Sequence, residues 1–345
     1  MKSKIGFLVY LITLLMLQSC SSKKQIPNTY LRKVKSISSA VTLKGDSTFF
    51  TPFAQIKQYN NLIYASDTRD NRMIVFDTLM NIKRIIGSTG SGPGEFKYCN
   101  AFDIYHDSLF IYDAGNKRME VFDINGNYSR SFILEKNINI IYKFCIGGNG
   151  LLYITTPYLN KPISVFNRSG KIIDQFGIWV NAKNEMLKIS KNYRSLVILD
   201  NKLISVLVSI PTVEIYSLQG ELINKIDLSK FTGIFNERLE HIKEEIKDNS
   251  NRPGRIIYSL INDINTSNNF LYLQYNTQLT EKHVNVNQIL VIEFSGNNVD
   301  IVKNLILTKN INDYYWSGAF CNASNFIFSY DLLTGTFNKF KIEGQ

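Results

Sequence analysis

Two stretches of the chain repeat one another and decide the fold: NLIYASDTRDNRMIVFDTLMNIKRII at residues 61–86 and SLFIYDAGNKRMEVFDINGNYSRSF at residues 108–132. Five positions agree at a constant offset of 46: Asp67 with Asp113, Arg72 with Arg118, Met73 with Met119, Phe76 with Phe122, and Asp77 with Asp123. Self-similarity at a period of about 40–50 residues indicates an array of small structural repeats.

One aromatic residue marks this repeat along the rest of the chain. It ends each strand of the VFD type and recurs at Phe76, Phe122, Phe166, Tyr216, Phe294 and Phe340. Successive gaps are 46, 44, 50, 78 and 46 residues, so six units are present and the long gap holds an insert of about 30 residues.

Each unit contains several short alternating apolar runs separated by turn residues, the pattern of antiparallel strands. The first turns are expected at Asn60-Asn61, Asp107-Ser108, Asn149-Gly150, Asn268-Asn269 and Ser324-Asn325. Four antiparallel strands in about 45 residues make one blade of a β-propeller. The sequence therefore predicts an all-β fold, a six-bladed β-propeller with aromatic residues packed between the blades.

The last unit is incomplete, because only KIEGQ follows Phe340. Residues 31–45 carry strand-like runs without a blade of their own. We expect this N-terminal strand to supply the missing outer strand of blade six, which would cover an exposed sheet edge and close the ring.

The insert around residues 232–262, assigned to blade five, has the spacing of a short amphipathic helix. Phe235, Leu239, Ile242 and Ile246 recur at intervals of four, three and four, and Asn236 can cap the start. Two interpretations remain open: a solvated decoration on the ring, or a lid or partner-docking element.

The N-terminus has the features of an export signal. Lys2 and Lys4 precede the uncharged stretch Ile5–Leu17 of 13 residues, a helix of about 20 Å that is too short for a bilayer core of about 30 Å. The tetrapeptide Leu17-Gln18-Ser19-Cys20 resembles the lipobox of bacterial lipoproteins, in which the cysteine is diacylated and becomes the mature N-terminus. An ordinary secretion signal with an incidental cysteine is the alternative.

This resemblance divides the chain into a signal peptide (1–19), a lipidated tether (20–30) and the propeller (31–345). The net charge of +10 is scattered, apart from Lys23-Lys24 and Arg32-Lys33 beside the expected membrane surface. A lipid membrane reached through acylated Cys20 is therefore the expected partner, and nucleic acid is not. The expected location is the bacterial cell envelope, with the propeller in the periplasm or at the cell surface.

The architecture resembles six-bladed propeller lipoproteins of the NHL-repeat and TolB-like type found in Bacteroidetes. NKRMEVFD at residues 116–123 is similar to the NHL pattern, and GSGPGEF at residues 90–96 is similar to its connector between blades. The resemblance implies a fold and a location, but propellers host many activities on one scaffold.

Repeated acid–arginine pairs are the first candidates for chemistry. Asp67 with Arg72, and Asp113 with Arg118, flank a tight loop, where the carboxylate can accept loop N–H groups and pair with the guanidinium. Since the pair recurs at equivalent positions, we interpret it as a structural turn clasp, with ligand contact as the alternative.

Candidate ligand contacts are Tyr314, Tyr315 and Trp316 before blade six, together with Asp103 and Glu95. The aromatic residues could stack on sugars or peptide side chains, although Trp316 could equally pack between blades. No cofactor is predicted.

Gluconolactonase-like propellers hold calcium in the channel. The alternative to a cofactor-free site is therefore calcium at Asp103 or Asp263, because oxygen ligands suit that ion.

The three other cysteines, Cys99, Cys145 and Cys321, lie among apolar residues. We expect buried free thiols, with one disulfide and a spare thiol as the alternative.

The residues show no convergent catalytic set. The predicted function is a membrane-anchored module that binds an envelope protein, peptide or glycan. A metal-dependent hydrolase, lactonase or lyase in the central channel is the alternative.

Overall fold

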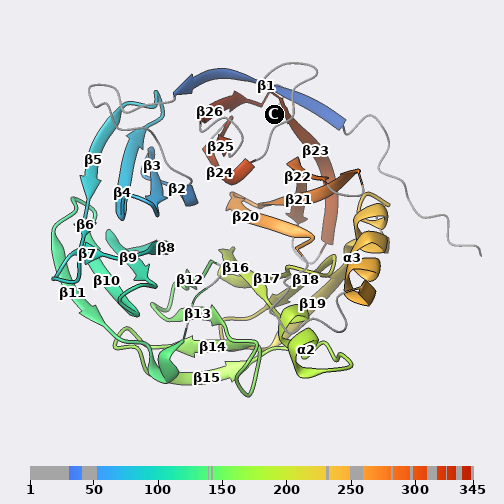
Figure 1. The fold of residues 1–345 in the computed structure, drawn as a ribbon, viewed down its shortest axis with the longest axis horizontal. Coiled ribbons are helices and arrows are strands. Elements are labelled where there is room, and N and C mark those ends of the chain that lie inside the picture. The colour runs from blue at the N-terminus through green and yellow to red at the C-terminus, as the bar shows by residue number, and fades with distance from the viewer. Residues whose placement is uncertain are drawn as a thin grey trace, which may run out of the picture.

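Six blades surround a central axis (Figure 1). The structure, a computed structural model, describes residues 31–40, 53–138, 140, 143–230, 233–248, 259–280, 283–295, 298–308, 317–323, 325–331 and 336–342. In these residues no helix has the length and apolar character needed to cross a membrane.

The first four blades are four-stranded antiparallel sheets whose first strand lies innermost. Blade one contains β2 (Phe53–Tyr59), β3 (Leu62–Asp67), β4 (Arg72–Asp77) and β5 (Ile82–Ile86), and blade two contains β8 (Cys99–Tyr105), β9 (Ser108–Asp113), β10 (Arg118–Asp123) and β11 (Tyr128–Phe132). Blade three contains β12 (Cys145–Ile146), β13 (Leu152–Thr155), β14 (Ile163–Phe166) and β15 (Ile172–Phe176), and blade four contains β16 (Arg194–Leu199), β17 (Lys202–Leu207), β18 (Thr212–Tyr216) and β19 (Leu222–Asp227). The short strands β6 (Ser88–Thr89) and β7 (Glu95–Phe96) pair in parallel within the first connector.

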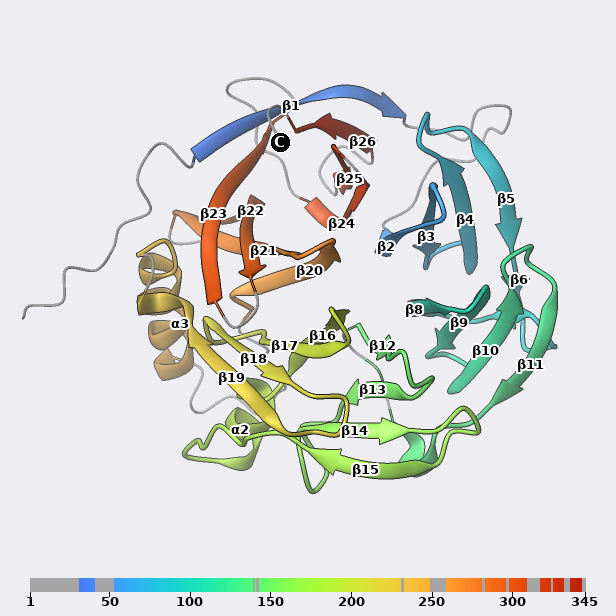
Figure 2. The same cartoon turned by 180° about the vertical axis from the view of Figure 1, so that it is seen from behind.

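Blades five and six form one eight-stranded sheet through the N-terminal strand. Blade five contains β20 (Ile261–Ser267), β21 (Phe270–Thr280), β22 (His283–Ser295) and β23 (Asn298–Thr308), and blade six contains β24 (Ser317–Ala323), β25 (Phe326–Asp331) and β26 (Thr336–Lys341). The strand β1 (Leu31–Ala40) is antiparallel to β26 along Ser36–Ala40, which confirms the predicted closure. Its first half also pairs in parallel with β23, so β1 joins the outer edges of both blades (Figure 2).

The turns between first and second strands use left-handed residues. Asn60 and Asn61 have φ of 46° and 59°, and His106 and Asp107 have φ of 42° and 57°. Positive φ at both central positions matches the twist of a two-residue hairpin, and after glycine, asparagine and aspartate tolerate it best. The turn expected at Asp107-Ser108 therefore lies one residue earlier, because Ser108 already belongs to β9.

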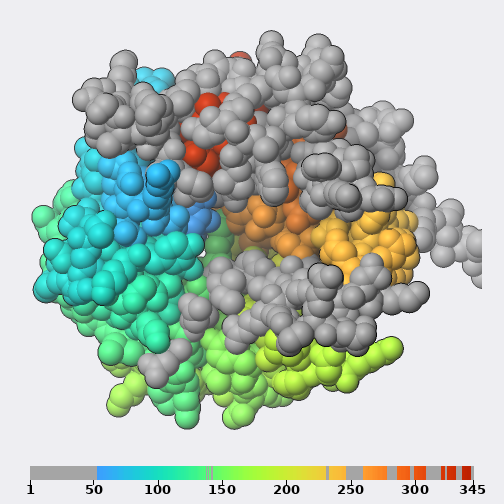
Figure 3. Space-filling model, viewed as in Figure 1, coloured from blue at the N-terminus to red at the C-terminus, as the bar shows by residue number. Residues whose placement is uncertain are grey.

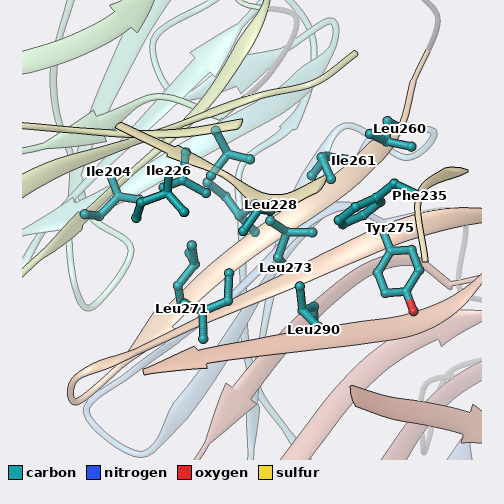
Figure 4. Packing of buried hydrophobic residues seen from close by; sticks show 14 of the residues in the cluster. Ile204, Ile226, Leu228, Phe235, Leu260, Ile261, Leu271, Leu273, Tyr275 and Leu290 are labelled. Atoms are coloured by element: carbon teal, nitrogen blue, oxygen red, sulfur yellow. The ribbon is translucent and has the colours of Figure 1, made fainter. Parts of the chain in front are cut away.

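Six apolar clusters hold the ring together, one at each interface between adjacent blades. Each repeat aromatic packs against the preceding blade and falls in a different cluster: Phe76, Phe122, Phe166, Tyr216, Phe294 and Phe340. Figure 4 shows the cluster between blades four and five, where Leu271 and Leu273 face Ile204 and Ile226. Their membership of these clusters confirms the predicted inter-blade role of the aromatic residues. Full burial of one such side chain contributes about 1.5–3 kcal/mol.

The residue after the repeat aromatic caps the next turn in four blades. Asp77, Asp123, Asn167 and Ser217 each accept backbone N–H groups from the residues two and four positions later. A short side chain with an oxygen acceptor satisfies otherwise unpaired turn donors. This requirement explains why the aspartate of VFD can become asparagine or serine in later blades.

The insert forms α3 (Asn236–Asp248) in the connector that enters blade five. It lies on the flank of the ring (Figure 1), where Phe235 packs on Tyr275 of β21 with ring centroids 5.3 Å apart. The long β21–β22 hairpin supplies further residues of the 78-residue gap. A second helix, α2 (Glu185–Lys191), was not predicted, although Asn184 caps it by accepting Leu187 N–H at 2.8 Å. Single 3₁₀ turns lie at η2 (Glu135–Asn137) and η3 (Leu228–Lys230).

Candidate functional site: the axial cavity

The innermost strands of all six blades border a cavity of about 120 Å³ on the ring axis. The blades pack side by side around this axis in the space-filling view (Figure 3). The wall carries these polar side chains: Gln55, Lys57, Gln58, Asp103, Lys143, Asn265, Thr266 and Asn322. Because one probe-sized volume of about 10–15 Å³ holds a water, the cavity has room for a small molecule.

The cavity lies toward the C-terminal ends of the innermost strands. Its wall residues on β2, β8 and β20 are found in the second halves of those strands or close to them, as Lys57, Asp103 and Asn265 illustrate. These strand ends lead into the first turns of the blades. The connectors between blades lie at the opposite ends of the strands, and Glu95, in the connector between blades one and two, is not part of this wall.

Polar side chains satisfy the inner edges of the innermost strands, which have no further strand to pair with. Gln55 of blade one donates to Phe102 O at 2.8 Å and accepts Phe102 N–H at 3.0 Å in blade two. In blade five, two residues bind the backbone of Phe320 in blade six. Asp263 accepts the Phe320 N–H at 3.3 Å, and Asn265 donates to the Phe320 carbonyl at 2.5 Å. These side chains connect neighbouring blades at the axis.

Asp103 lies in the cavity wall, as predicted for an inner-strand acid, but donors already surround it. Its carboxylate accepts Ile146 N–H at 2.7 Å and Ile104 N–H at 2.9 Å and forms an ion pair with Lys57. Asp103 therefore bridges β2, β8 and β12.

Asp263 has the same kind of environment. Lys143 of blade three reaches its Oδ1 at 2.6 Å, and Ile264 N–H donates to that oxygen at 2.8 Å. Burial raises the pKa of the Asp263 carboxyl above its usual value, and the Lys143 ammonium opposes that rise.

This donor set does not fit calcium, which takes six to eight oxygen ligands. Asp103 and Asp263 each bind a lysine ammonium instead. In the part of the chain that the structure describes, no cluster of three or more His, Cys, Asp or Glu side chains could hold a metal ion. We derive no metal-assisted step at this site.

Polar groups in the wall, Asn322 and Lys57 among them, remain available for a ligand. Asn322 is 4% exposed, and neither its Nδ2 nor its Oδ1 has a hydrogen-bond partner in the described residues. Lys57 Nζ makes one bond, to Asp103, while its side chain is 36% exposed. An unpaired buried amide costs about 1–3 kcal/mol, so Asn322 is the feature of this wall that the scaffold alone does not explain.

The repeated acid–arginine pairs differ between the first two blades. Asp67 binds Arg72 Nε at 3.0 Å, and burial raises the Asp67 pKa while Arg72 opposes this rise. In blade two Asp113 accepts Tyr98 N–H at 3.0 Å, as expected for a loop acceptor. The expected pairing of Asp113 with Arg118 is wrong.

Arg118 pairs instead with the fully buried Glu120 of its own strand, at 2.5 Å. It also donates to the carbonyls of Ser91 at 3.0 Å and Gly92 at 2.5 Å in the glycine-rich connector. Glu120 lies two residues from Arg118 on the same face of β10, so it competes with Asp113 for the guanidinium. The lone pairs of Asp113 already accept loop N–H groups.

The other candidate contacts lie elsewhere. Glu95 is in the β6–β7 connector on the rim of the ring, where its Oε2 accepts Gly92 N–H at 2.7 Å (Figure 1). Tyr314, Tyr315 and Trp316, like Cys20, fall outside the described residues.

A family model described as a six-bladed β-propeller, DUF5128, matches residues 41–286. The chain belongs to this family. No curated protein matches the chain.

Solved structures resemble this DUF5128 propeller at low sequence identity. A member of the DUF4221 family from Bacteroides vulgatus is 10% identical with a TM-score of 0.59, over 90% of this chain and 98% of that one. A protein of Bacteroides fragilis described as exported is 13% identical with a TM-score of 0.55, over 87% of both chains. A virginiamycin B lyase from Staphylococcus aureus is 10% identical over 88% and 99%, and its TM-score of 0.49 carries no argument. At these low identities, the similarities show only that this chain shares the propeller fold.

Cys99, Cys145 and Cys321 are buried free thiols, as expected. Burial raises the pKa of each thiol well above its ordinary value. Cys145 and Cys321 also border the axial cavity, but such thiols are weak nucleophiles because little thiolate forms.

Sequence reasoning missed Lys57, Lys143 and Asn322 as site residues of this propeller. One signal was present for Lys57, which precedes Asp103 by the repeat offset of 46. Charges of opposite sign at equivalent positions of adjacent blades predict an ion pair at the axis. Asn322 lies in a blade whose motif has decayed, and no pattern distinguishes it from other asparagines.

Proposed function

We propose that this DUF5128 propeller is a lipid-anchored envelope protein, of the NHL and TolB-like kind, that binds a small polar ligand in its axial cavity. The repeat motif at residues 116–123 and the lipobox-like segment ending at Cys20 support the type and the anchor. The exported neighbour from Bacteroides fragilis fits an envelope location.

The buried amide of Asn322 carries the ligand-binding part of this proposal. Asn322 borders the cavity, and its buried side-chain nitrogen and oxygen have no hydrogen bond in the described residues. A polar ligand would satisfy both atoms and repay the cost of burying them.

The test is a ligand-observed NMR screen of the full chain in non-ionic detergent against hydroxy acids, amino acids, monosaccharides and dipeptides. Asn322→Leu is expected to abolish the binding of any hit. The same variant is expected to be as stable as the wild type or more stable by about 1–3 kcal/mol, because it removes an unpaired amide.

Asn265→Leu is the matched control on a neighbouring inner strand. Its amide donates to Phe320 O, so this variant is expected to lose stability in urea unfolding. A screen without hits, or an Asn322→Leu variant that still binds and loses as much stability as Asn265→Leu, would refute the proposal.

Anchoring is tested separately at Cys20. Cells fed an alkyne fatty acid are expected to label the wild-type chain, whereas Cys20→Ser is expected to lose the label and leave the membrane fraction, since acyl chains provide durable attachment. Cys99→Ser is the control because that thiol is buried in the ring. Equal labelling of wild type and Cys20→Ser would exclude this anchor.

A further inference from the structure

We infer that the ligand of the axial cavity is a small carboxylate, bound by the ammonium groups of Lys57 and Lys143 and by the Asn322 amide. This inference rests on the proposed function and names the chemical class that the same cavity takes.

Hydrogen-bond donors outnumber acceptors among the groups left free in the wall. An ammonium has three N–H donors. Lys57 uses one of them on Asp103, and Lys143 uses two, on Asp263 and on Ile264 O at 2.9 Å. Three ammonium donors therefore remain in the described residues, together with two from Asn322 Nδ2.

The two carboxylates that contact these lysines already accept three donors each, so about one lone-pair site remains on each. The carboxylate oxygens of Asp103 and Asp263 accept two backbone N–H groups and a lysine each. A sugar would need such acceptors for its hydroxyl donors. A carboxylate only accepts, with about four lone-pair sites, and charge-assisted bonds from ammonium groups are the strong ones.

The charges favour one negative group on the ligand. The two lysines of the wall are balanced by Asp103, which also lines the cavity, and by Asp263, which Lys143 contacts. A second negative charge on the ligand would lie near the Asp103 carboxylate, which repels it. A monocarboxylate is therefore expected to bind more tightly than inorganic phosphate.

The test compares L-lactate with lactamide, which have the same shape and differ in charge. Isothermal titration of the full chain in non-ionic detergent is expected to give a Kd at least about tenfold lower for lactate than for lactamide or phosphate. Gln58 also borders the cavity, and its side chain has no hydrogen bond in the described residues. Gln58→Glu places a negative charge there without removing a scaffold bond, so it is expected to weaken lactate about tenfold and leave lactamide unchanged.

Gln219→Glu makes the same substitution at an exposed turn of blade four and is expected to change neither Kd. Equal or tighter binding of lactamide or phosphate would overturn the carboxylate assignment, as would no binding of any of the three probes. In those cases a neutral hit from the NMR screen that Asn322→Leu abolishes would leave the proposed function standing. A screen without hits would remove both.

Discussion

Arg194 shows how a single residue can stabilise one blade through a buried charge. Its guanidinium is fully buried, lies 3.3 Å from Glu214 Oε2, and donates to the carbonyls of Asn192 at 2.7 Å and Ile178 at 2.6 Å. Tyr216 O–H donates to the same carboxylate oxygen at 2.9 Å. Each member of this group depends on the others for its hydrogen bonds.

Arg194→Met is expected to lower the free energy of unfolding by about 3–5 kcal/mol, because it leaves the buried Glu214 without its closest cation. Urea unfolding followed by circular dichroism measures this loss. Lys202→Met, which removes a surface ion pair with Asp200, is the control and is expected to cost at most about 1 kcal/mol. Similar losses in both variants would contradict the assigned role of burial.

At the scale of elements, the turn caps at the ends of β4 and β10 predict a pH dependence. Hydrogen bonds from the Asn127 side chain and backbone lower the pKa of Asp123. For Asp77, burial acts to raise the pKa, but hydrogen bonds from Asn81 outweigh it and the pKa is lowered. A carboxyl whose pKa falls on folding stabilises the protein above its unfolded pKa of about 3.9, and this contribution is lost as pH falls through the folded pKa.

The double variant Asp77→Asn/Asp123→Asn is therefore expected to lose less thermal stability than the wild type between about pH 5 and pH 2. Asn167 makes the same turn bonds in blade three without a titrating group, so the variant should fold. Melting curves across this range provide the measurement, with the exposed Asp200→Asn as control. Parallel pH profiles for the double variant and the wild type would refute the prediction.

At the scale of the whole molecule, stability depends on closure of the ring by β1. Removing residues 1–40 is expected to lower the free energy of unfolding by about 5 kcal/mol or more, because nine of the ten residues of β1 pair with β23 or β26 and each ladder bond contributes about 0.5–1.5 kcal/mol. Removing residues 1–30 keeps β1 and is the matched control. Calorimetry of both truncated chains measures the difference, and identical melting temperatures would show that β1 is dispensable.

The blade count and closure could be predicted because both follow from local periodicity. The spacing of the repeat aromatics gives the number of blades. Because blade six lacks its outer strand, the strand-like N-terminal segment is the candidate that completes it. The site could not be predicted in the same way, because periodicity does not say which groups remain unpaired at the axis. Asp103 looked like a ligand contact, but Ile146 N–H and Lys57 bind it. Asn322 became visible only when the hydrogen bonds around it were known.

The pairing of β1 with β26 also sets the order of events when the chain is made. Ser36 is synthesised early, and its partner Phe340 is synthesised about 300 residues later. Chains are built from the N-terminus, and contacts between distant residues form slowly. The first four blades can assemble in succession while β1 is unpaired, because its partners β23 and β26 belong to blades five and six. Closure is then the final step of folding, so a chain cut short anywhere before blade six retains an open strand edge.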